Sequence, residues 1–496
     1  MAPSTDNTIS APVWLGLDVG TQSVRCVATD HTGTTVASGS HPLRSVREGR
    51  RHEQDPDKWW SALIAACSQT MEGVGARPVR GLALCATSGT ILLADDRLEP
   101  LTPGLMYDDA RAEDEARRAV EAGEELWGRL GYRPQASWAL PKLLWLLEHH
   151  AAADTGRLLH QADYLTSLLA GRRTAADSSH ALKTGYDLDN ERWPEDVLAA
   201  LHVPEAVLPE VVRPGTPIGE VGPEAAELTG IPVGTPIIAG MTDGCASVLG
   251  SGTLTVGSWN SVLGTTLVLK GVTDLRVRDP LGVVYSHRAP GGNWLPGGAS
   301  SVGAGVLSEL FAGADLDRLT TLAAERPQST VVTYPLVSKG ERFPFVAAEA
   351  HRFTLGEPAD DVDAYAAVLR GVAFVERLCF DYLDLLGAPT DGTVTTTGGG
   401  ARNRYWTRLR ATVLDRPISV PRDADPAAGM ALLARSHESS LAEAARDLVR
   451  DAEVVEPDPA ARDVLTEGYL TLVEALHGRG WLPDELATHA RKRSAR

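Results

Sequence analysis

Two aspartates, Asp18 and Asp243, are the side chains of this 496-residue chain best placed to do chemistry. Asp18 ends the apolar run that starts at Trp14, and a turn of small and hydroxyl residues follows it. A carboxylate at that place can hold a metal-bound water, while the turn directs amides and hydroxyls at phosphate oxygens. The string also fits an ordinary hairpin with an aspartate in its turn. The turn residues are Gly20, Thr21, Gln22 and Ser23.

Asp243 lies between an apolar segment, residues 236–239, and a run of small residues that ends at Gly252. If the first segment is a strand and the second a helix, the Asp243 carboxylate lies at a helix N-terminus facing a cleft. Aspartate is also a favoured N-cap residue, and a general base must keep one carboxylate oxygen free of the cap. Asp243 is therefore our candidate base, with the N-cap as the alternative interpretation.

A second glycine-threonine turn follows about half the chain later, at Gly264, Thr265 and Thr266. Val262 occupies the place that Asp18 has in the first turn, so only one of the two turns would carry a metal carboxylate. Taken alone, this string favours a simple hairpin. The recurrence of the turn indicates two domains that start alike, each with a phosphate hairpin.

Three consecutive glycines, Gly398, Gly399 and Gly400, separate an expected strand from an expected helix. Glycines lack a Cβ and let a flat ring approach the backbone, and a helix start can hold a phosphate. A plain strand-to-helix connection would need fewer glycines, so the segment predicts a nucleotide site. Asn403 lies on the first helical turn, and Trp406 is expected in the core.

An acceptor site is predicted from two polar segments. Ser88 lies in the string Ala-Thr-Ser-Gly-Thr at the end of an expected strand, and Asp109 and Arg111 form an Asp-x-Arg pair. Together these groups can hydrogen-bond a polyol in several directions. The alternative interpretations are a satisfied turn for the first segment and a surface ion pair for the second.

The elements that would carry these residues start the same way twice. Three short strands open the chain as an antiparallel meander, which is not how a Rossmann domain begins. Residues 91–95 are expected to pair as a hairpin with the strand 79–86, and residues 172–192 read as a polar loop. A second strand, turn and strand begin at residue 256, which predicts a domain boundary within 243–255.

The full set of expected elements alternates strands with helices, as in an α/β protein. The expected strands are 14–17, 24–28, 34–38, 79–86, 91–95, 236–239 and 393–397, and the expected helices are 55–71, 111–150, 160–169, 359–386, 403–414, 425–436 and 459–477.

The composition argues against several other classes of protein. Acidic residues number 65 and basic residues 47, and a net charge of −18 repels nucleic acids and anionic membranes. We therefore expect no nucleic-acid partner and no membrane partner. The five cysteines show no CxxC spacing, which predicts buried free thiols in a reducing cytoplasm, without a zinc site or a disulfide framework. Residues 1–12 show no secretory signal, and no GxxxxGK[ST] phosphate loop occurs.

In their order along the chain, these motifs resemble the FGGY carbohydrate kinases, a branch of the group that includes actin and the hexokinases. The resemblance runs from about Trp14 to Ala434, and the segment 139–149 is similar to a family signature, with Lys142 and Trp145 in place. It implies an α/β fold of two actin-like, ribonuclease H-like ATPase domains around a central cleft. Residues 1–245 would bind the sugar and carry the first phosphate hairpin, and residues 246–496 would bind ATP. Whether the last helices pack back on the first domain stays open.

The resemblance also implies the reaction, in which ATP is the co-substrate, Mg²⁺ assists and a sugar hydroxyl accepts the phosphate. Asp243 would be the base and would contact the sugar, together with Ser88, Asp109 and Arg111. Asp18 would hold the water shell of Mg²⁺. ATP and its phosphates would be bound by Gly20, Thr21, Gln22, Ser23, Gly264, Thr265, Thr266, Gly398, Gly399, Gly400 and Asn403.

D-Ribulose is the expected acceptor. Xylulokinases tend to carry Gln-Met-His in the acceptor loop and glycerol kinases an Arg-Glu pair, whereas this chain has Ala-Thr-Ser-Gly at 86–89. With Met-Tyr-Asp-Asp-Ala-Arg at 106–111 and Ala-Leu-Lys-Thr-Gly-Tyr-Asp at 181–187, the loop resembles that of the D-ribulose kinases of cyanobacteria and plants. D-Xylulose or another ketose or polyol is the second candidate. A homodimer, a catalytically silent sugar or nucleotide sensor, and a phosphatase-like relative stay open as alternatives.

Overall fold

The computed structural model describes residues 11–150, 155–326, 329–422, 424–445 and 452–495. These residues form two compact units. Unit 1 takes those within Met1–Gly252, His287–Asn293 and Asp423–Arg450, and unit 2 takes those within Thr253–Ser286, Trp294–Arg422 and Asp451–Arg496. The first passage between the units falls inside the expected boundary region. A single division after residue 245, however, leaves out the two later segments that return to unit 1.

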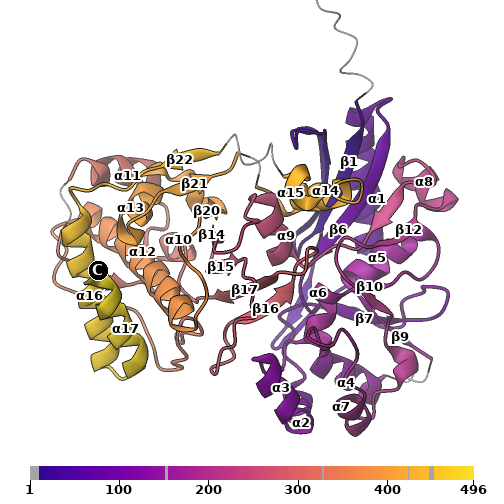
Figure 1. Ribbon diagram of the computed structural model, residues 1–496, viewed down its shortest axis with the longest axis horizontal. Coiled ribbons are helices and arrows are strands. Elements are labelled where there is room, and N and C mark those ends of the chain that lie inside the picture. Colours follow the sequence, from indigo (N-terminus) through magenta and orange to yellow (C-terminus); the bar gives the residue numbers. More distant parts are fainter. Residues whose placement is uncertain (1–10, 151–154, 327–328, 423, 446–451, 496) are drawn as a thin grey trace, which may run out of the picture. The chain divides into compact units, whose positions relative to one another are not determined.

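Unit 1 is built on a six-stranded sheet with the order β12-β13-β6-β1-β2-β3, of which β1, β6 and β12 are labelled in Figure 1. The first three strands form the expected antiparallel meander, and β6 lies parallel to β1. This register places Asp18 of β1 opposite Arg25 of β2 and Cys85 of β6. The strands are β1 (Val13–Val19), β2 (Ser23–Thr29), β3 (Thr35–Pro42), β6 (Val79–Ala86), β12 (Pro217–Glu220) and β13 (Pro236–Ile238).

Helices α1 (Pro56–Val74) and α14 (Pro426–Arg435) cover the two faces of this sheet. Side chains alternate between the faces along β1, so Leu15 joins the core that includes α1 while Gly16 faces α14. A Cβ at Gly16 would lie 1.7 Å from the carbonyl oxygen of Ala427, so only glycine permits this approach. The backbone of α14 therefore lies directly against the strand that ends near Asp18.

The second sheet of unit 1 has the order β4-β5-β8-β7-β9. β7 pairs with β8 and β9, so the prediction that it forms a hairpin with β6 is wrong. The four residues between β6 and β7, 87–90, lead the chain from one sheet to the other and are held by side-chain hydrogen bonds, which a reading of strand periodicity does not detect. The strands are β4 (Val46–Glu48), β5 (Arg51–Gln54), β7 (Ile91–Ala94), β8 (Gly104–Leu105) and β9 (Arg157–His160).

Residues 172–192, expected as a polar loop, instead contain a strand and short helices. Most polar side chains of residues 174–187 are buried, and several of them have partners: the carboxylate of Asp177, for example, accepts the backbone N–H of His180 at 2.9 Å and caps the helix. The elements here are β10 (Ala176–Asp177), α6 (Ser178–Ala181) and the 3₁₀ turn η1 (Leu182–Thr184). The remaining elements of unit 1 are α2 (Glu113–Ala122), α3 (Glu124–Leu130), α4 (Ala139–His149), α5 (Gln161–Ala170), α7 (Glu195–Ala200), η2 (Glu205–Val207), β11 (Val211–Val212), α8 (Pro223–Thr229), α9 (Asp243–Gly250) and α15 (Leu441–Ala444).

Unit 2 repeats the main sheet of unit 1. Six strands in the order β22-β21-β20-β14-β15-β17 match β12-β13-β6-β1-β2-β3 one by one, in both neighbour and direction. The weak repeat in the sequence is therefore a repeat of topology. The strands are β14 (Trp259–Leu263), β15 (Leu267–Gly271), β17 (Trp294–Ala299), β20 (Val394–Thr397), β21 (Ile418–Val420) and β22 (Glu453–Val455). A seventh strand, β16 (Tyr285–Arg288), is next to β17 in the sheet order, and its last two residues are assigned to unit 1.

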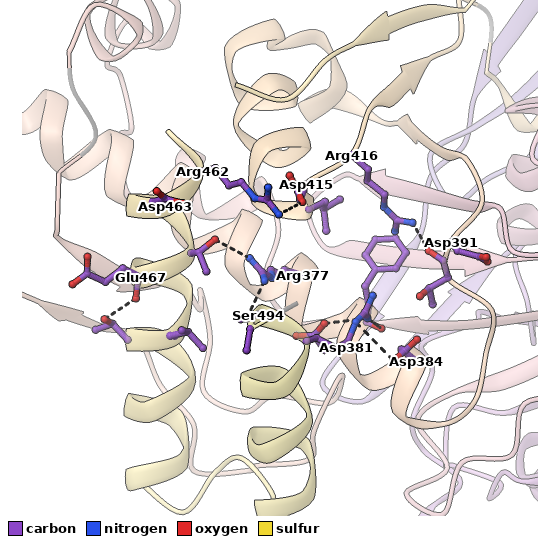
Figure 2. A pocket seen from close by; sticks show the side chains of 18 of the residues that line it. Arg377, Asp381, Asp384, Asp391, Asp415, Arg416, Arg462, Asp463, Glu467 and Ser494 are labelled. Atoms are coloured by element: carbon purple, nitrogen blue, oxygen red, sulfur yellow. Dashed lines mark hydrogen bonds and ion pairs between the residues drawn. The ribbon is translucent and has the colours of Figure 1, made fainter. Parts of the chain in front are cut away.

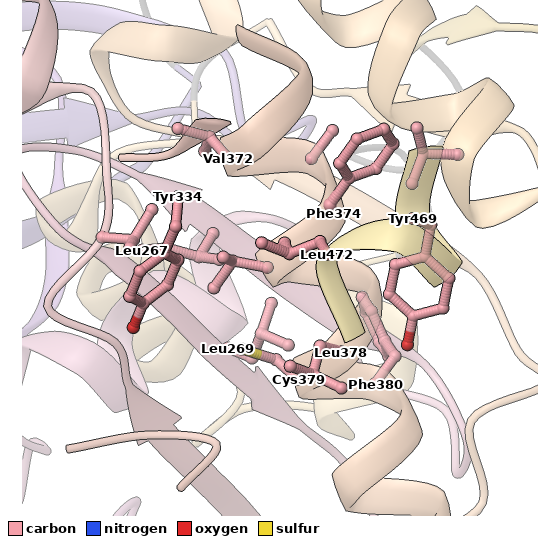
Figure 3. Close-up of a cluster of buried hydrophobic side chains, with 14 of the residues drawn as sticks. Leu267, Leu269, Tyr334, Val372, Phe374, Leu378, Cys379, Phe380, Tyr469 and Leu472 are labelled. Atoms are coloured by element: carbon pink, nitrogen blue, oxygen red, sulfur yellow. The ribbon is translucent and has the colours of Figure 1, made fainter. Parts of the chain in front are cut away.

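The core of unit 2 forms around the long helix α12 (Asp361–Leu385), whose Val372, Leu378 and Phe380 pack with Leu269 of the sheet (Figure 3). Helices α16 (Arg462–Gly478) and α17 (Asp484–Ser494) add buried side chains to this same core. The last helices thus pack within unit 2. The other elements of unit 2 are α10 (Gly305–Leu310), α11 (Leu316–Ala324), β18 (Val332–Tyr334), β19 (Phe353–Leu355), η3 (Gly399–Arg402) and α13 (Arg404–Leu414).

Candidate active site

The turn after Asp18 is closed and held from outside the hairpin. The backbone N–H of Gly20 donates to the carbonyl oxygen of Ser23 at 3.0 Å. The amide of Gln54 donates to the carbonyl oxygen of Thr21 at 2.7 Å, which ties the turn to β5. Because the backbone carries these bonds, the exposed side chain of Ser23 and the half-buried one of Thr21 keep their hydroxyls available.

Three carboxylates from separate parts of unit 1, Asp18, Asp243 and Asp425, act on one another. Burial, and then the negative charges of the other two, raise the pKa of Asp18 to about 7. The thiol of Cys85, with its Sγ 3.5 Å from Oδ1 of Asp18, and the guanidinium of Arg25 oppose this shift. Arg25 itself forms an ion pair with Asp425. Negative charge is therefore concentrated at the end of β1, where a cation would relieve it.

The donor set of this cluster fits Mg²⁺. This ion prefers oxygen ligands, keeps several of its waters and needs only one or two protein carboxylates. Burial and like charge disfavour ionised Asp18, and a bound divalent cation would reverse both effects. Asp18 is thus the residue suited to hold the ion or its waters.

Asp243 is the first residue of α9, and the N-cap position belongs to Thr242. Its Oδ1 accepts the backbone N–H of Gly244 at 2.7 Å. The start of the helix is anchored by Ser179, whose Oγ accepts the backbone N–H of Thr242 at 3.2 Å and lies 3.1 Å from Nδ1 of His287. The Asp243 carboxylate therefore stands on a fixed helix start and does not serve as the N-cap.

The acceptor loop, residues 87–90, is held by buried side chains. The hydroxyls of Thr87 and Thr90 lie 2.5 Å apart. Nζ of Lys142 donates to the carbonyl oxygens of Gly89 at 2.6 Å and Met106 at 2.7 Å, and burial lowers the pKa of this lysine to about 7. Lys142 thus links the two predicted acceptor segments through their backbones.

Ser88 is fixed by its backbone and open at its side chain. Its carbonyl oxygen accepts from Nζ of Lys183 at 3.0 Å. Its Oγ is enclosed and finds no hydrogen-bond partner among the residues that the structure describes. The alternative interpretation of this segment, a turn whose polar groups are all hydrogen-bonded, therefore does not hold for the Ser88 hydroxyl.

Asp109 and Arg111 form a buried ion pair. Asp109 is fully buried, and its Oδ2 accepts the backbone N–H of His52 and Nη2 of Arg111, each at 2.7 Å. Arg111 also reaches Glu53 at 2.6 Å and stacks on the ring of Trp145 at 4.8 Å. The ion pair is buried, so the prediction that it lies on the surface is wrong. It joins β5 to the segment after β8. These bonds already occupy both side chains. A direct contact of either residue with sugar stays a prediction.

His180 carries a charge next to the acceptor loop. Its Nδ1 lies 2.6 Å from Oδ2 of Asp177, and its Nε2 donates to the carbonyl oxygen of Ala86 at 3.2 Å. Burial alone would lower its pKa, but the charge and hydrogen bond of Asp177, with Asp163 further away, raise it to about 9. The imidazolium is therefore a fixed positive group at the end of β6.

The second glycine-threonine turn, predicted to bind phosphate, lies in unit 2 and is closed in a similar way. The backbone N–H of Gly264 donates to the carbonyl oxygen of Thr266 at 3.1 Å, and that of Gly305 donates to the carbonyl oxygen of Thr265 at 3.1 Å. The side chain of Thr265 is exposed. The turn thus offers a hydroxyl on a fixed backbone, as predicted from its residues.

The three glycines after β20 have different reasons to be glycine. Gly398 has φ +86°, and a Cβ there would lie 2.7 Å from the carbonyl oxygen of Leu263. A Cβ at Gly400 would lie 2.5 Å from the Leu263 side chain, whereas one at Gly399 would meet nothing within 4 Å. Two of the three glycines are therefore required by packing. A strand-to-helix connection at this place thus needs two of its three glycines without any ligand. The nucleotide site stays a prediction.

Asn403 is the N-cap of α13, because its Oδ1 accepts the backbone N–H of Trp406 at 2.9 Å. Its Nδ2 donates to Thr320 at 3.0 Å. Trp406 is buried and donates to the carbonyl oxygen of Leu369, which confirms its expected core position. An adenosine contact from Asn403 stays a prediction.

A hollow of about 1290 Å³ in unit 2 has none of these residues in its lining (Figure 2). It is lined by α12, α16 and the C-terminal end of α17, and several of its charged side chains have partners within unit 2: Arg377 donates to the hydroxyl of Ser494 at 2.9 Å, and Arg493 forms an ion pair with Asp381 at 3.1 Å. Its size alone therefore does not make it the active site.

Sequence reasoning missed Asp425, Gln161 and the His180–Asp177 pair. Asp425 was expected only as a helix start, and it does cap α14 by accepting the backbone N–H of Ala427 at 2.8 Å. Its approach to Asp18 depends on α14 lying against β1, which no local pattern encodes. The five cysteines are free and buried, as expected.

Comparison with known proteins identifies the class. Residues 13–250 match the N-terminal domain, and residues 259–437 the C-terminal domain, of the FGGY family of carbohydrate kinases. These matches cover most of the chain, which therefore belongs to this family. It is an ATP-dependent phosphotransferase that acts on a sugar hydroxyl, and the sequence-based assignment to the family is confirmed.

Particular relatives are named xylulose kinases. The chain is 31% identical over 433 residues to the xylulose kinase of Streptomyces coelicolor, covering 83% of this chain and 84% of the relative. It is 30% identical over 430 residues to that of Streptomyces rubiginosus, with 84% and 85% covered. The crystal structure of xylulose kinase from Rhodospirillum rubrum superposes with a TM-score of 0.83 at 27% identity, covering 94% of this chain and 99% of that one. No helix in the described parts of the chain is long and apolar enough to cross a membrane.

Proposed function

We propose that this kinase phosphorylates a pentulose at its C5 hydroxyl, with D-ribulose as the acceptor. The observation that carries the proposal is the pairing, within unit 1, of a carboxylate cluster at the end of β1 with a buried acceptor loop at the end of the adjacent strand β6. The cluster supplies a base and a cation site. The loop supplies an enclosed hydroxyl, Ser88 Oγ, without a protein partner among the described residues.

The chemistry requires one proton transfer and one phosphoryl transfer. The C5 hydroxyl of the sugar gives its proton to the carboxylate of Asp243 as its oxygen forms a bond to the γ-phosphorus, and the bond to the leaving oxygen of ADP breaks. Phosphoryl transfer of this kind depends mainly on positioning and on neutralising charge. Asp243 suits the role because α9 fixes its backbone and Thr242 provides the N-cap.

Asp18 and the two glycine-threonine turns would position the phosphates. Mg²⁺, when bound, would neutralise phosphate charge. Asp18 would orient it, while the hydroxyls of Thr21 and Thr265 would donate to phosphate oxygens. The glycines 398–400 and Asn403 would lie along the adenosine, and the side chain of Gln22 and the hydroxyls of Ser23 and Thr266 would complete the phosphate contacts.

The choice of D-ribulose rests on the acceptor loop. D-Ribulose and D-xylulose differ in configuration at one hydroxyl-bearing carbon. A buried site that pairs this hydroxyl would leave a polar group unpaired with the wrong epimer, which costs about 1–3 kcal/mol. D-Xylulose is the second candidate because the relatives that cover most of the chain are named xylulose kinases.

A panel of D-ribulose, D-xylulose, L-ribulose, glycerol and ribitol with ATP tests the proposal by ADP release. We expect kcat/KM for D-ribulose to exceed that for D-xylulose by about tenfold or more. Ser88→Ala should weaken D-ribulose turnover more than ATP binding. A preference for D-xylulose would replace the acceptor and keep the pentulose kinase. Sugar-independent phosphate release would indicate a phosphatase-like protein, and no turnover with any sugar would indicate a sensor.

A further inference from the structure

Gln161 presents a buried hydrogen-bond donor without a partner next to the acceptor loop. It is the first residue of α5 and is fully buried. Its backbone N–H donates to the carbonyl oxygen of Thr90 at 3.1 Å, and its Oε1 accepts from the hydroxyl of Thr87 at 3.1 Å. Its Nε2 is enclosed and has no hydrogen-bond partner among the described residues.

The surroundings hold this donor in place. Thr87, the partner of its Oε1, is itself hydrogen-bonded to Thr90, and Lys142 and Lys183 fix the backbone of the loop between them. Ser88, the next residue, has the second enclosed polar atom without a partner in this loop. Buried polar atoms are nearly always hydrogen-bonded, so one such atom on the loop and another on the helix start bonded to it indicate a ligand that supplies their partners.

The proposed reaction states which ligand atom an amide N–H would need. A pentulose closes its furanose ring through the C5 oxygen onto C2, so a free C5 hydroxyl exists only in the open-chain form, in which C2 is a ketone. A ketone oxygen accepts hydrogen bonds and cannot donate them. The –NH₂ of a glutamine side chain donates and cannot accept, so the two groups are complementary.

We propose that Nε2 of Gln161 donates a hydrogen bond to the C2 ketone oxygen of the open-chain pentulose, and that the Ser88 hydroxyl binds a neighbouring hydroxyl of the sugar. The proposal rests on the pentulose kinase function proposed above. Gln161 thereby selects the ketose in the chemical form that can be phosphorylated at C5. An acceptor without an oxygen at C2 would lose this bond and leave Nε2 unpaired.

The experiment compares two acceptors on two forms of the protein. D-Ribulose is paired with 2-deoxy-D-erythro-pentitol, which has the same C3 and C4 configuration and a CH₂ group at C2. Gln161→Met keeps the length of the side chain and removes its amide. We expect kcat/KM for D-ribulose to fall at least tenfold in Gln161→Met, while kcat/KM for the deoxypentitol changes less than threefold.

Two further variants separate this role from a structural one. Gln161→Glu keeps an oxygen for Thr87 and replaces the donor with an acceptor, so it should lose more D-ribulose activity than Gln161→Met. Thr166→Val lies on the same helix and removes a hydroxyl that bonds to Ala162 and Thr174 inside the fold, so it should affect both acceptors equally and little. Circular dichroism and ATP binding establish that each variant is folded.

The outcomes distinguish the proposal from the function on which it rests. Equal losses for both acceptors in Gln161→Met, or an unchanged kcat/KM for D-ribulose, would overturn the role of Gln161 and leave the pentulose kinase intact. If the wild-type protein prefers D-xylulose, the same comparison is made with D-xylulose and 2-deoxy-D-threo-pentitol, with the same expected result. If the folded wild-type protein phosphorylates no pentulose, the proposed function fails and the role of Gln161 fails with it.

Discussion

The two units place different residues at the same point of the same topology. In unit 1, Asp18 lies opposite Arg25 of the next strand and Cys85 of the parallel strand. In unit 2, Val262 lies at the matching register, opposite Val268 and Thr397. Both positions precede a glycine-threonine turn by the same spacing. The repeated fold thus supplies two similar turns, and only the first of them follows the carboxylate that we predict to hold the metal.

Buried charge also differs between the units. In unit 2, Arg410 and Glu376 are both fully buried and joined by two hydrogen bonds of 2.6 and 2.7 Å, and Ser261 donates to the same carboxylate. In unit 1, Asp18 lies among like charges that raise its pKa to about 7. A satisfied ion pair stabilises the fold, whereas an unbalanced carboxylate cluster is suited to bind a cation and accept a proton.

Removing the base should have the largest effect. Asp243→Asn keeps the shape of the side chain and cannot accept the sugar proton, so kcat should fall by about 10²–10⁴-fold. Sugar and nucleotide binding, measured by calorimetry, should stay close to wild type. Turnover near the wild-type rate would assign Asp243 a structural role at the start of α9.

Of the variants described here, one that breaks the buried ion pair of Arg410 and Glu376 should lose the most stability. Glu376→Gln leaves the guanidinium of Arg410 buried without its counter-charge, which should lower the free energy of unfolding by about 3–5 kcal/mol. Denaturant unfolding measures it.

A double variant provides the control for this pair. Glu376→Leu combined with Arg410→Met removes both charges and should recover much of the loss. The kcat of the protein that remains folded should be unchanged in every case, and a change in kcat would show that the pair acts on the reaction.

Replacing Asp18 by valine, the residue at the matching position of unit 2, should weaken the response of kcat to Mg²⁺. Asp18→Val copies the residue at 262, and kcat at ordinary Mg²⁺ concentration should fall by about a hundredfold because the phosphate charge loses its positioned counter-ion. A Mg²⁺ titration checks this prediction, with Val262→Thr in unit 2 as the matched control, which should titrate like wild type. The same apparent Mg²⁺ affinity and kcat in Asp18→Val and wild type would contradict the assignment.

The charge on His180 should give a smaller, pH-dependent effect. Its pKa is raised in the folded protein to about 9, so it stabilises the fold fully below the unfolded value of about 6.5 and this contribution is lost as the pH rises through 9. The free energy of unfolding should fall by about 1–3 kcal/mol between pH 6.5 and 9 relative to His180→Gln. Urea unfolding at several pH values measures the difference, and parallel curves for the two proteins would exclude a charged His180.

Elements with a strong local pattern could be predicted from the sequence. The strand 79–86 and the helix 403–414 agree with the structure to within one residue, because buried alternation and a capped apolar stripe are properties of short segments. The polar segment 172–192 could not be predicted. Its central side chains are buried, and some of their partners come from distant parts of unit 1, such as the carbonyl oxygen of Ala86 for His180.

The sequence by itself determined the family, and it predicted the two phosphate turns and the candidate base, because each depends on residue types at fixed spacing along the chain. Only the tertiary structure decided what surrounds those residues. The charge of Asp425 acts on Asp18 because α14 packs on β1, which a glycine at position 16 permits. The side-chain oxygen of Gln161 accepts from Thr87 where α5 begins beside the acceptor loop. Packing brings together residues that are far apart in the chain. Burial and the negative charges of Asp243 and Asp425 raise the pKa of Asp18, and one donor of Gln161 is left without a partner among the described residues.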